Sequence, residues 1–546
     1  MTSCAMLFLF ALAACTPDPH PTTQGDPGTT ETTSDPVDDR RCPDDDLPHE
    51  AFLIAPYVQL VQPTSAWILW ETQAGLESRV DYGTDTTLAS TACGSLVPLL
   101  PGDDPTDDPT LVHEVELTGL APSTLYHYRV QTGDGQGEIL QFTTAPAPAD
   151  EASFRLVAMG DSQRDDTYPD RYREVVQDGV MAVASDASLV LFAGDLVDNG
   201  WFVDEWKDDF FAPGAALMSG VPFYPVLGNH EGGSPLYFRY FHLPENGDSE
   251  YYYHFDYSNV RVIGLDSNAG YSDLIQLSWL DDVLAETCGA EAIDFVFAQV
   301  HHPFLSELWT PGNLDWTGEV VARLEAFSAD CDKPSIHFYG HTHGYSRGQT
   351  QAHKHVMVNV SSAGGALDRW GEQPQEDYPA FSVSEDTYGF VVVDVEAGDD
   401  PAFSLQRISR GTPDAPVNNA VSDTLTVPRY NIPPDTPTAL NLGPACPAAP
   451  LTASVFGDAD LHDHQASHWQ VGDDCGDFST PIFEAWVQHE NRYFGVDTQA
   501  GDNLEDHAFP ELEVGMDYCW RVRYRDSGLA WSAWSSPEVI TPVDCG

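Results

Sequence analysis

The chain has 546 residues, of which 42% are hydrophobic and 11% aromatic, so it is long enough for several domains with packed cores. It holds 23 Lys and Arg residues against 86 Asp and Glu residues, which gives a formal net charge of −63 at pH 7. General nucleic-acid binding and docking onto anionic lipid both require a cationic surface. The composition therefore argues against both as main roles and indicates a strongly hydrated, acidic surface.

The first apolar run, residues 6–14, ends in Leu-Ala-Ala directly before Cys15. It is too short to cross a bilayer, which needs about 20 residues. Residues 1–14 resemble a bacterial lipoprotein signal peptide, and the resemblance implies that Cys15 becomes the lipidated first residue of an exported, outer-membrane-anchored protein. No Lys or Arg precedes the apolar run, which departs from that pattern. The alternative is an ordinary cleaved secretory signal and a secreted protein.

Residues 15–48 are rich in Thr, Pro, Asp and Gly and almost lack apolar side chains, which predicts a disordered tether. Beyond Cys4 and Cys15 the chain has an even set of cysteines, which in an exported protein predicts disulfide bonds. Segment order favours two bonds early in the chain, Cys42–Cys93 and Cys288–Cys331. Two more bonds are expected, with three connectivities open, among Cys446, Cys475, Cys519 and Cys545.

Residues 49–148 contain short alternating runs between turn-rich stretches, for example residues 66–70 and 112–117. Period-two alternation over several short runs is typical of an all-β sandwich. The sequence Leu-Thr-Gly-Leu-Ala-Pro at 117–122, followed by Tyr-His-Tyr-Arg-Val at 126–130, resembles a fibronectin type III domain. An N-terminal sandwich of this kind is therefore expected.

Residues 151–430 alternate apolar strand-like runs with helical runs such as 274–284 and 319–327, which predicts a layered α/β domain. Residues 431–450 are rich in proline and predict a linker. Residues 451–546 return to short alternating runs. The expected architecture is therefore multidomain, with all-β sandwiches before and after a central α/β domain.

In the C-terminal region, residues 520–525 alternate with arginines and residues 531–535 read Trp-Ser-Ala-Trp-Ser. This resembles an element of some fibronectin type III domains, and the arginines are expected to stack on the two Trp rings. Three nearby histidines, His462, His464 and His468, could form a second metal cluster. Because no strand-end pattern supports a cluster there, a polar loop is the preferred interpretation.

In the central region, five apolar strand-like runs each end in metal-binding side chains. Ligands of open α/β sheets bind at the carboxyl ends of the strands, so these five ends are expected to converge on one crevice. Carboxylate, amide and imidazole groups suit divalent or trivalent ions of borderline or hard character. A glycine before three of the ends is expected to let the backbone turn sharply. The residues are Asp161, Asp195, Asn229 with His230, His301 with His302, and His341 with His343.

This order of motifs resembles the calcineurin-like metallophosphoesterases and, within them, the purple acid phosphatases. The matching motifs are Gly-Asp at 160–161, Gly-Asp-Leu-Val-Asp at 194–198, Gly-Asn-His-Glu at 228–231, His-His-Pro at 301–303 and Gly-His-Thr-His-Gly-Tyr-Ser-Arg at 340–347. The resemblance implies a four-layer α/β domain behind a fibronectin-like domain. It also implies two metal ions, whose identity among iron, zinc, manganese and calcium stays open.

The resemblance implies a role for each strand-end residue. Asp195 would bridge the two ions and is expected to be essential for catalysis, and Asp161 and His343 would complete the first site. His230 would face the phosphate as a proton donor or transition-state stabiliser. The remaining ligands of the second site would be Asn229, His301 and His341.

Two residues depart from the family pattern. Purple acid phosphatases have a Tyr ligand where this chain has Asp198, and many other metallophosphoesterases have a His where it has Gln163. Gln163 is expected either to bind the first ion weakly through its amide oxygen or to leave that position to water. Asp198 is a second candidate ligand of that ion, and without the Tyr no purple colour is expected.

Three further residues are candidates for contact with a substrate. His302 could instead be a metal ligand or a packed turn residue. Arg347 could clamp a substrate oxygen through two hydrogen bonds, with Tyr345 beside it. A structural ion pair between Arg347 and an acidic neighbour is the alternative interpretation.

The sequence thus favours an exported, metal-dependent phosphatase that hydrolyses phosphomonoesters of small molecules by attack of a metal-bound hydroxide at a binuclear site. A phosphodiesterase or nucleotidase of the same family is the first alternative. A surface binding or adhesion protein with an inert central domain is the second. Substrate choice is expected to depend on the loops at 201–213, 231–248 and 305–317.

Overall fold

The computed structural model describes residue 42 and residues 52–544, apart from 74, 76, 100–109, 133–134, 149, 442 and 447–448. The predicted signal peptide, the lipidation site at Cys15 and the tether up to residue 41 lie outside the described residues. Among the helices that are described, none is long and apolar enough to cross a membrane.

The N-terminal domain is a sandwich of two antiparallel sheets, as predicted, and the predicted disulfide Cys42–Cys93 attaches residue 42 to the end of one strand. Alternate side chains of the two sheets meet in a core that includes Trp70, Val115 and Tyr128. The first sheet has the order β1 (Ile54–Gln59), β2 (Ser65–Thr72), β6 (Leu111–Thr118), β5 (Ser95–Pro98). The second has the order β4 (Ser90–Cys93), β3 (Arg79–Gly83), β7 (Leu125–Thr132), β8 (Gly135–Gln136), with β9 (Leu140–Thr143) also paired to β7.

The central domain is built on two mixed sheets, and the candidate ligands follow parallel strands in both. The six-stranded sheet has the order β12 (Phe223–Pro225), β11 (Leu189–Phe192), β10 (Phe154–Met159), β20 (Tyr388–Glu396), β21 (Ala402–Gly411), β22 (Pro416–Pro428). The nine-stranded sheet has the order β13 (Tyr253–Tyr257), β14 (Val260–Gly264), β15 (Phe295–Val300), β16 (Ser335–Tyr339), β18 (His355–Asn359), β17 (Tyr345–Gln349), β19 (Phe381–Glu385), β27 (Arg492–Tyr493), β28 (Val496–Asp497).

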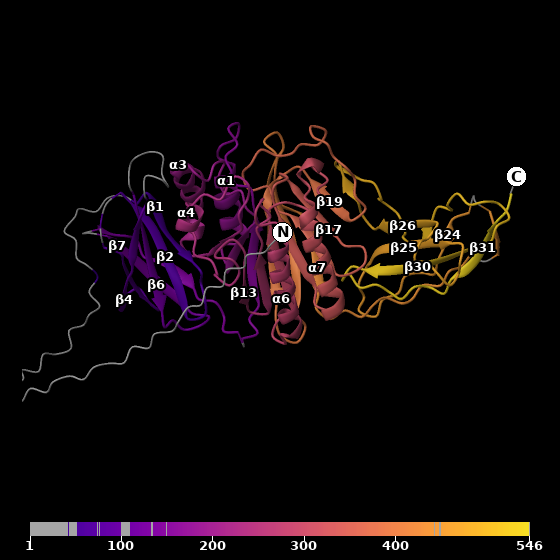
Figure 1. Cartoon of the computed structure of the whole chain (residues 1–546), viewed down its shortest axis with the longest axis horizontal. Helices are drawn as coiled ribbons and strands as arrows, with labels where there is room; N and C mark the ends of the chain where they lie inside the picture. Colours follow the sequence, from indigo (N-terminus) through magenta and orange to yellow (C-terminus); the bar gives the residue numbers. More distant parts are fainter. Residues whose placement is uncertain are drawn as a thin grey trace, which may run out of the picture. The chain divides into compact units, whose positions relative to one another are not determined.

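Helices cover the outer faces of the two sheets, which gives the four layers expected. Helices α6 (Leu274–Gly289) and α7 (Asp315–Cys331) lie side by side (Figure 1) and pack through Leu280 and Leu324 on the nine-stranded sheet. The two sheets face each other, and the rings of Phe297 and Phe403 meet at 5.3 Å between them. The disulfide Cys288–Cys331 joins the ends of α6 and α7, as predicted.

Shorter helices pack on the outer face of the six-stranded sheet or in the loops. Phe210 of this layer contacts Phe192 of β11, with ring centroids 5.8 Å apart. The helices are α1 (Arg171–Glu174), the π-helix η1 (Val175–Val180), α2 (Met181–Val183), α3 (Val203–Glu205), the π-helix η2 (Trp206–Phe211), α4 (Ala212–Met218), α5 (Tyr237–Tyr240) and the 3-10 turn η3 (Thr310–Gly312).

The C-terminal region is all-β, as predicted, with Trp469 stacked on Trp520 in its core at 5.8 Å. Among the four C-terminal cysteines, whose pairing the sequence left open, Cys475 is bonded to Cys519. Cys446 is also disulfide-bonded. One sheet has the order β23 (Gly443–Ala445), β31 (Glu538–Pro542), β30 (Tyr518–Asp526), β25 (His464–Gly472), β26 (Phe483–Gln488). A second consists of β24 (Leu451–Thr452) and β29 (Asp506–His507).

The predicted stack of arginines and tryptophans is present on β30. Arg521 lies 4.1 Å from the Trp534 ring, and Arg523 lies between Trp531 at 4.2 Å and Trp534 at 4.7 Å. Arg525 continues the row 5.4 Å from Trp531. Cation–π contacts of this kind hold the segment after β30 against the strand.

The C-terminal region also supplies two strands to the central sheet, which the sequence patterns did not indicate. β27 pairs in parallel with β19, with Arg492 opposite Val383, and β28 turns back on β27. Just before β27, the Gln488 amide donates to the backbone carbonyls of Pro379 and Phe381. The last β region is therefore joined to the central domain through shared sheet hydrogen bonds.

Candidate metal centre

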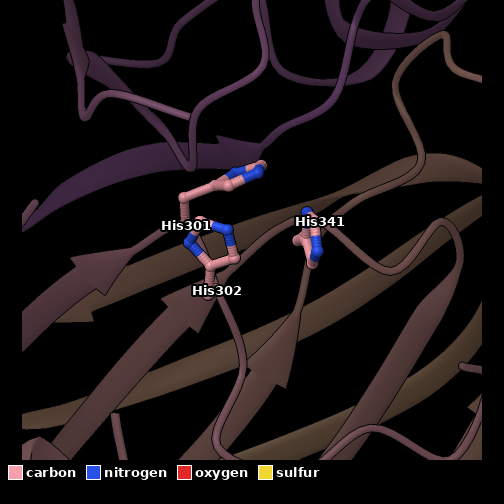
Figure 2. A group of neighbouring side chains, drawn as sticks. All are labelled: His301, His302 and His341. Carbon is pink, nitrogen blue, oxygen red and sulfur yellow. The ribbon is translucent and has the colours of Figure 1, made fainter. Parts of the chain in front are cut away.

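The predicted strand ends meet in one cluster. Parallel strands β15 and β16 are neighbours, and the histidines that follow them, His301, His302 and His341, face one another (Figure 2), with ligand atoms within 4.8 Å. Asp161 and Asp195, which follow the neighbouring strands β10 and β11 of the other sheet, have ligand atoms within 4.8 Å of His301. The two sheets thus contribute to the same group of side chains.

The backbone at three of these ends is strained. Asp161, Asp195 and His341 have φ angles of 57°, 52° and 71°, in the left-handed region that side chains rarely adopt. Such conformations persist only where the surroundings hold them, and they concentrate at functional sites. Here the strained backbone changes the direction in which each side chain projects, directly after its strand ends.

The first group of candidate ligands contains Asp161, His343 and Gln163. His343 Nε2 lies 3.3 Å from Asp161 Oδ1 and 3.1 Å from Gln163 Nε2. His343 Nδ1 donates to the Ala366 carbonyl at 2.6 Å, so Nε2 is the nitrogen left for a cation. Asp161 Oδ2 and Gln163 Oε1 are buried and receive no hydrogen bond from any described residue. These oxygens and Nε2 fit a divalent cation.

The second group contains Asp195, Asn229, His301 and His341. His301 Nε2 lies 3.1 Å from both Asp195 Oδ2 and Asn229 Oδ1. Its Nδ1 donates to the Ala193 carbonyl at 2.8 Å, which fixes the ring with Nε2 toward the carboxylate. The His341 ring lies 5.1 Å from the His301 ring. This set also fits a cation, because the buried Asp195 carboxylate and His301 imidazole meet the exposed Asn229 amide and the half-buried His341.

His302 joins this second group beside both His301 and His341 (Figure 2). Its ring lies 4.4 Å from the His341 ring, and its Nδ1 is 2.8 Å from the Ser267 hydroxyl. Its Nε2 is therefore the atom available to a cation or a substrate. The position is consistent with either of the two active roles expected for His302.

When no cation is bound, the carboxylates of the cluster keep two of its histidines protonated. Burial alone would lower the pKa of His301, but the Asp195 carboxylate raises it to about 10. Burial would likewise lower the pKa of His343, and Asp161 raises it to about 9. Burial and the neighbouring His301 lower the pKa of His341. Cation binding at His301 and His343 must therefore release protons, whereas His341 is already neutral.

His230 lies at the edge of the cluster with one nitrogen turned toward it. Its Nδ1 donates to the Asp198 carbonyl at 2.6 Å, and its Nε2 lies 3.9 Å from Asp195 Oδ2. The Asp198 side chain is 62% exposed. Asp198 thus holds His230 through its backbone, and His230 Nε2 is free to meet a substrate oxygen.

Glu231 and Asp368 support the cluster in roles that the sequence reasoning did not assign. The buried Glu231 carboxylate accepts hydrogen bonds from the backbone N–H groups of Asp195, Leu196 and Gly228. Burial and the Asp195 charge raise its pKa to about 7. Asp368 accepts a hydrogen bond from the His343 N–H at 2.8 Å. Glu231 stood in the quoted Gly-Asn-His-Glu motif, whereas no motif marked Asp368.

Arg347 and Tyr345 do not face the cluster. The Arg347 guanidinium is buried and donates to Asp423 at 2.6 and 3.0 Å and to Glu490 at 3.1 Å. The Tyr345 hydroxyl donates to the same Asp423 carboxylate at 2.6 Å. This geometry favours the structural alternative for both residues over contact with a substrate.

A cavity of about 340 Å³ adjoins the cluster through Gln163. Its lining combines two cations, Arg164 and Arg173, with acidic groups that include Asp208. Residues 201–213, expected to be a loop that influences substrate choice, are instead mostly helical, in α3, η2 and the start of α4, and part of this segment borders the polar cavity beside the first group of ligands.

Comparison with known proteins agrees with this arrangement. Residues 154–345 match the family described as calcineurin-like phosphoesterase, and residues 55–144 match the purple acid phosphatase N-terminal domain. In Arabidopsis thaliana, a protein named probable inactive purple acid phosphatase 27 is 22% identical over 417 residues, and purple acid phosphatase 23 is 25% identical over 287 residues. The alignments cover 66% and 43% of this chain, and 64% and 57% of those proteins.

Two solved structures share the fold. The purple acid phosphatase PPD1 from yellow lupin (Lupinus luteus) has a TM-score of 0.55 and 16% identity, covering 68% of this chain and 74% of its own. The structure of PhoD has a TM-score of 0.52 and 12% identity, covering 70% and 92%. The chain therefore contains a calcineurin-like phosphoesterase domain preceded by a purple acid phosphatase N-terminal domain.

Proposed function

We propose that this protein is a metal-dependent phosphatase that hydrolyses phosphomonoesters at a centre for two cations. The observation that supports it best is the meeting of Asp161, Asp195 and His301 within 4.8 Å, because it joins the two groups of candidate ligands. Asp161, His343 and Gln163 would hold one cation, Asn229, His301 and His341 the other, and Asp195 both. Bound there, the pair would supply activation of a water molecule and positive charge for the phosphoryl oxygens.

The side chains around the centre have distinct tasks in this proposal. Because its Nδ1–H is committed to the Asp198 carbonyl, His230 donates from Nε2 to an oxygen of the phosphate as the imidazolium, and although burial would lower its pKa, the Asp195 charge raises it. Glu231 is a positioning residue, because it binds the backbone on both sides of the Asp195 and Asn229 turns. The two cations, once bound, would also offer an anionic substrate local positive charge in a chain of net charge −63.

The candidate ligands favour an active enzyme over an inert binding module. Two of the Arabidopsis thaliana relatives are named probable inactive purple acid phosphatases. In this chain the ligand positions that the resemblance implies are occupied except at Gln163 and Asp198, and the Gln163 amide nitrogen lies 3.1 Å from His343 Nε2. An adhesion protein would have no need for a buried Asp161 carboxylate oxygen and a buried Gln163 amide oxygen that receive no hydrogen bond from the described residues.

We further propose that the protein acts outside the cytoplasm, anchored through Cys15. The disulfides Cys42–Cys93, Cys288–Cys331 and Cys475–Cys519 support an oxidising compartment. The acidic surface suits a soluble body held near, but not inserted in, a membrane.

The test compares a chromogenic phosphomonoester with its diester analogue, using chelator-treated protein to which iron, manganese, zinc or calcium is added singly. We expect Asp195→Asn to lower turnover of the monoester at least 1000-fold, because the shared carboxylate charge is lost. Asp186→Asn is the matched control, since Asp186 precedes β11 where Asp195 follows it, and its side chain is 71% exposed. Equal turnover by Asp195→Asn and wild type would exclude the two-cation centre, and faster hydrolysis of the diester would favour the phosphodiesterase alternative.

A further inference from the structure

A second group of metal-binding side chains lies in the C-terminal region, outside the centre described above. Asp458 and His462 belong to the loop between β24 and β25, and Asp526 is the last residue of β30. One ligand atom of each lies within 4.8 Å of the ligand atoms of the other two. The group that the sequence suggested is different, because His464 and His468 are on strand β25 rather than in a polar loop.

Those two histidines are occupied elsewhere. The His464 ring stacks on Phe456 at 4.4 Å. His468 Nε2 lies 2.7 Å from Glu484. Of the three histidines considered, His462 is therefore the one that meets carboxylates in a potential cation site.

Asp526 supplies the strongest sign of a missing partner. The residue is 0% exposed, and its Oδ1 accepts hydrogen bonds from Asn431 Nδ2 at 2.9 Å and from the Ala530 N–H at 3.0 Å. Its Oδ2 is buried and receives no hydrogen bond from the described part of the chain. A buried carboxylate oxygen left without a donor is rare in folded proteins and calls for a partner such as an ion.

Asp458, in the loop between β24 and β25, has the same hydrogen-bond pattern as Asp526. Its Oδ1 accepts hydrogen bonds from the backbone N–H groups of Asp460 at 2.8 Å and His462 at 3.1 Å. Its Oδ2 is also buried without a donor from any residue that the structure describes. Two carboxylates thus each use one oxygen to fix the backbone and leave the other available.

His462 completes the set with a defined orientation. Its Nδ1 lies 3.1 Å from Asn431 Oδ1, which only accepts hydrogen bonds, so Nδ1 carries the proton and Nε2 is the available ligand atom. The same Asn431 side chain donates to Asp526 through Nδ2. One amide therefore orients both an imidazole and a carboxylate, as residues behind metal ligands commonly do.

We infer that Asp458, His462 and Asp526 bind one divalent cation, zinc or manganese. Two carboxylate oxygens and one imidazole nitrogen suit these two ions, whereas calcium prefers oxygen ligands alone. Asn431 lies three residues after β22 ends at Pro428, so the ion fixes the path by which the chain enters the C-terminal region. Its role is structural and independent of the proposed phosphatase centre.

The experiment uses the full chain, treated with chelator, reloaded with zinc or manganese, desalted and analysed for bound metal per chain. We expect His462→Gln and Asp526→Asn each to bind one ion fewer than wild type, with turnover of a phosphomonoester unchanged. Asp460→Asn is the matched control, because it removes a carboxylate from the same loop and should keep the full metal content. Because the readout is the difference in bound metal between each variant and wild type, it reports on this site whether or not the central site is filled.

Thermal unfolding provides a second readout that does not depend on counting ions. Adding zinc or manganese should raise the melting temperature of wild type and Asp460→Asn more than that of His462→Gln and Asp526→Asn. Unchanged metal content and an unchanged melting shift in both ligand variants would overturn the inference. If Asp526→Asn fails to fold, His462→Gln alone decides, since its imidazole is at the edge of the loop and partly exposed.

Discussion

Gly228 and Gly340 show how far the candidate centre depends on residues without side chains. A Cβ at Gly228 would lie 2.1 Å from Asp195 Oδ1, and a Cβ at Gly340 would lie 2.5 Å from Asp161 Oδ2. A glycine before a strand-end ligand was expected to allow a sharp turn of the backbone. Of Gly194, Gly228 and Gly340, only Gly194 has a positive φ angle, which is 89°. At the other two positions glycine allows the backbone to approach a ligand closely.

Gly228→Ala is therefore expected to displace Asp195 and lower turnover at least about 100-fold, because small shifts of reacting groups have effects of that size. Gly289→Ala is the control, since nothing lies within 4 Å of a Cβ at that position. The measurement is the rate of phosphomonoester hydrolysis together with the metal content. A Gly228→Ala enzyme within twofold of wild type would contradict this account of the glycine.

Residues of the candidate centre could be predicted from the sequence where the signal lies in the positions directly before them. Asp161, Asp195 and Asn229 each follow an apolar run and a glycine, and the sequence records both signals. The pairing of Arg347 was not predictable, because its partners Asp423 and Glu490 are distant in the sequence. Only the assembled sheets bring these charges together.

At the scale of elements, the loop after β15 depends on one buried acid. The Glu307 carboxylate accepts hydrogen bonds from the Tyr378 N–H at 2.8 Å and the Ser384 hydroxyl at 2.7 Å, which joins this loop to β19. Two residues further on, the Trp309 ring lies 5.2 Å from the His341 ring. The loop therefore places an aromatic wall beside the candidate centre.

Burial raises the pKa of Glu307 to about 8 from an ordinary value of 4.5. Between these values the folded chain keeps a proton that the unfolded chain has lost, so this group's contribution to stability is present at pH 4.5 and is lost as the pH rises toward 8. In Glu307→Gln the contribution is absent. As the pH rises across this window, we expect the free energy of unfolding of Glu307→Gln minus that of wild type to increase by about 1.4 kcal/mol per pH unit.

Urea unfolding of chelator-treated protein at pH 5, 6, 7 and 8 measures this difference. Titration of the other groups cancels in the comparison, because both proteins share them. A constant difference across the four pH values would show that the pKa of Glu307 in the folded protein is not raised above its value in the unfolded chain.

Element prediction from the sequence succeeded where periodicity was long. The helical runs at 274–284 and 319–327 lie within α6 and α7, and the alternating run at 126–130 lies within β7. It missed β27 and β28, which have two residues each, because no periodicity can develop over such a length. Their strand conformation comes from the edge of β19, a contact between distant segments.

At the scale of the whole molecule, Arg347 ties three parts together. It lies on β17 of the nine-stranded sheet, Asp423 lies on β22 of the six-stranded sheet, and Glu490 precedes β27. Burial would raise the pKa of Asp423, but the Arg347 charge lowers it. The ion pair is thus formed in the folded protein at neutral pH.

Arg347→Leu leaves the buried Asp423 carboxylate without its cation, while Glu490 keeps Arg492 at 3.1 Å, and is expected to destabilise the protein by about 3–5 kcal/mol. Turnover and KM per folded molecule should stay within about twofold of wild type. The control is Arg323→Leu, which removes an ion pair on the surface of α7 and should cost at most about 1 kcal/mol. If Arg347→Leu instead kept its stability and raised KM, the arginine would be a substrate contact after all.

The parallel pairing of β27 with β19 has a consequence for how the protein is made. β19 ends at Glu385, and its neighbour in the sheet begins at Arg492, so the sheet edge waits for a segment synthesised much later. Domains usually fold as they emerge from the ribosome, in order from the N-terminus. Until the final region is available, the phosphoesterase domain therefore keeps an open sheet edge at β19.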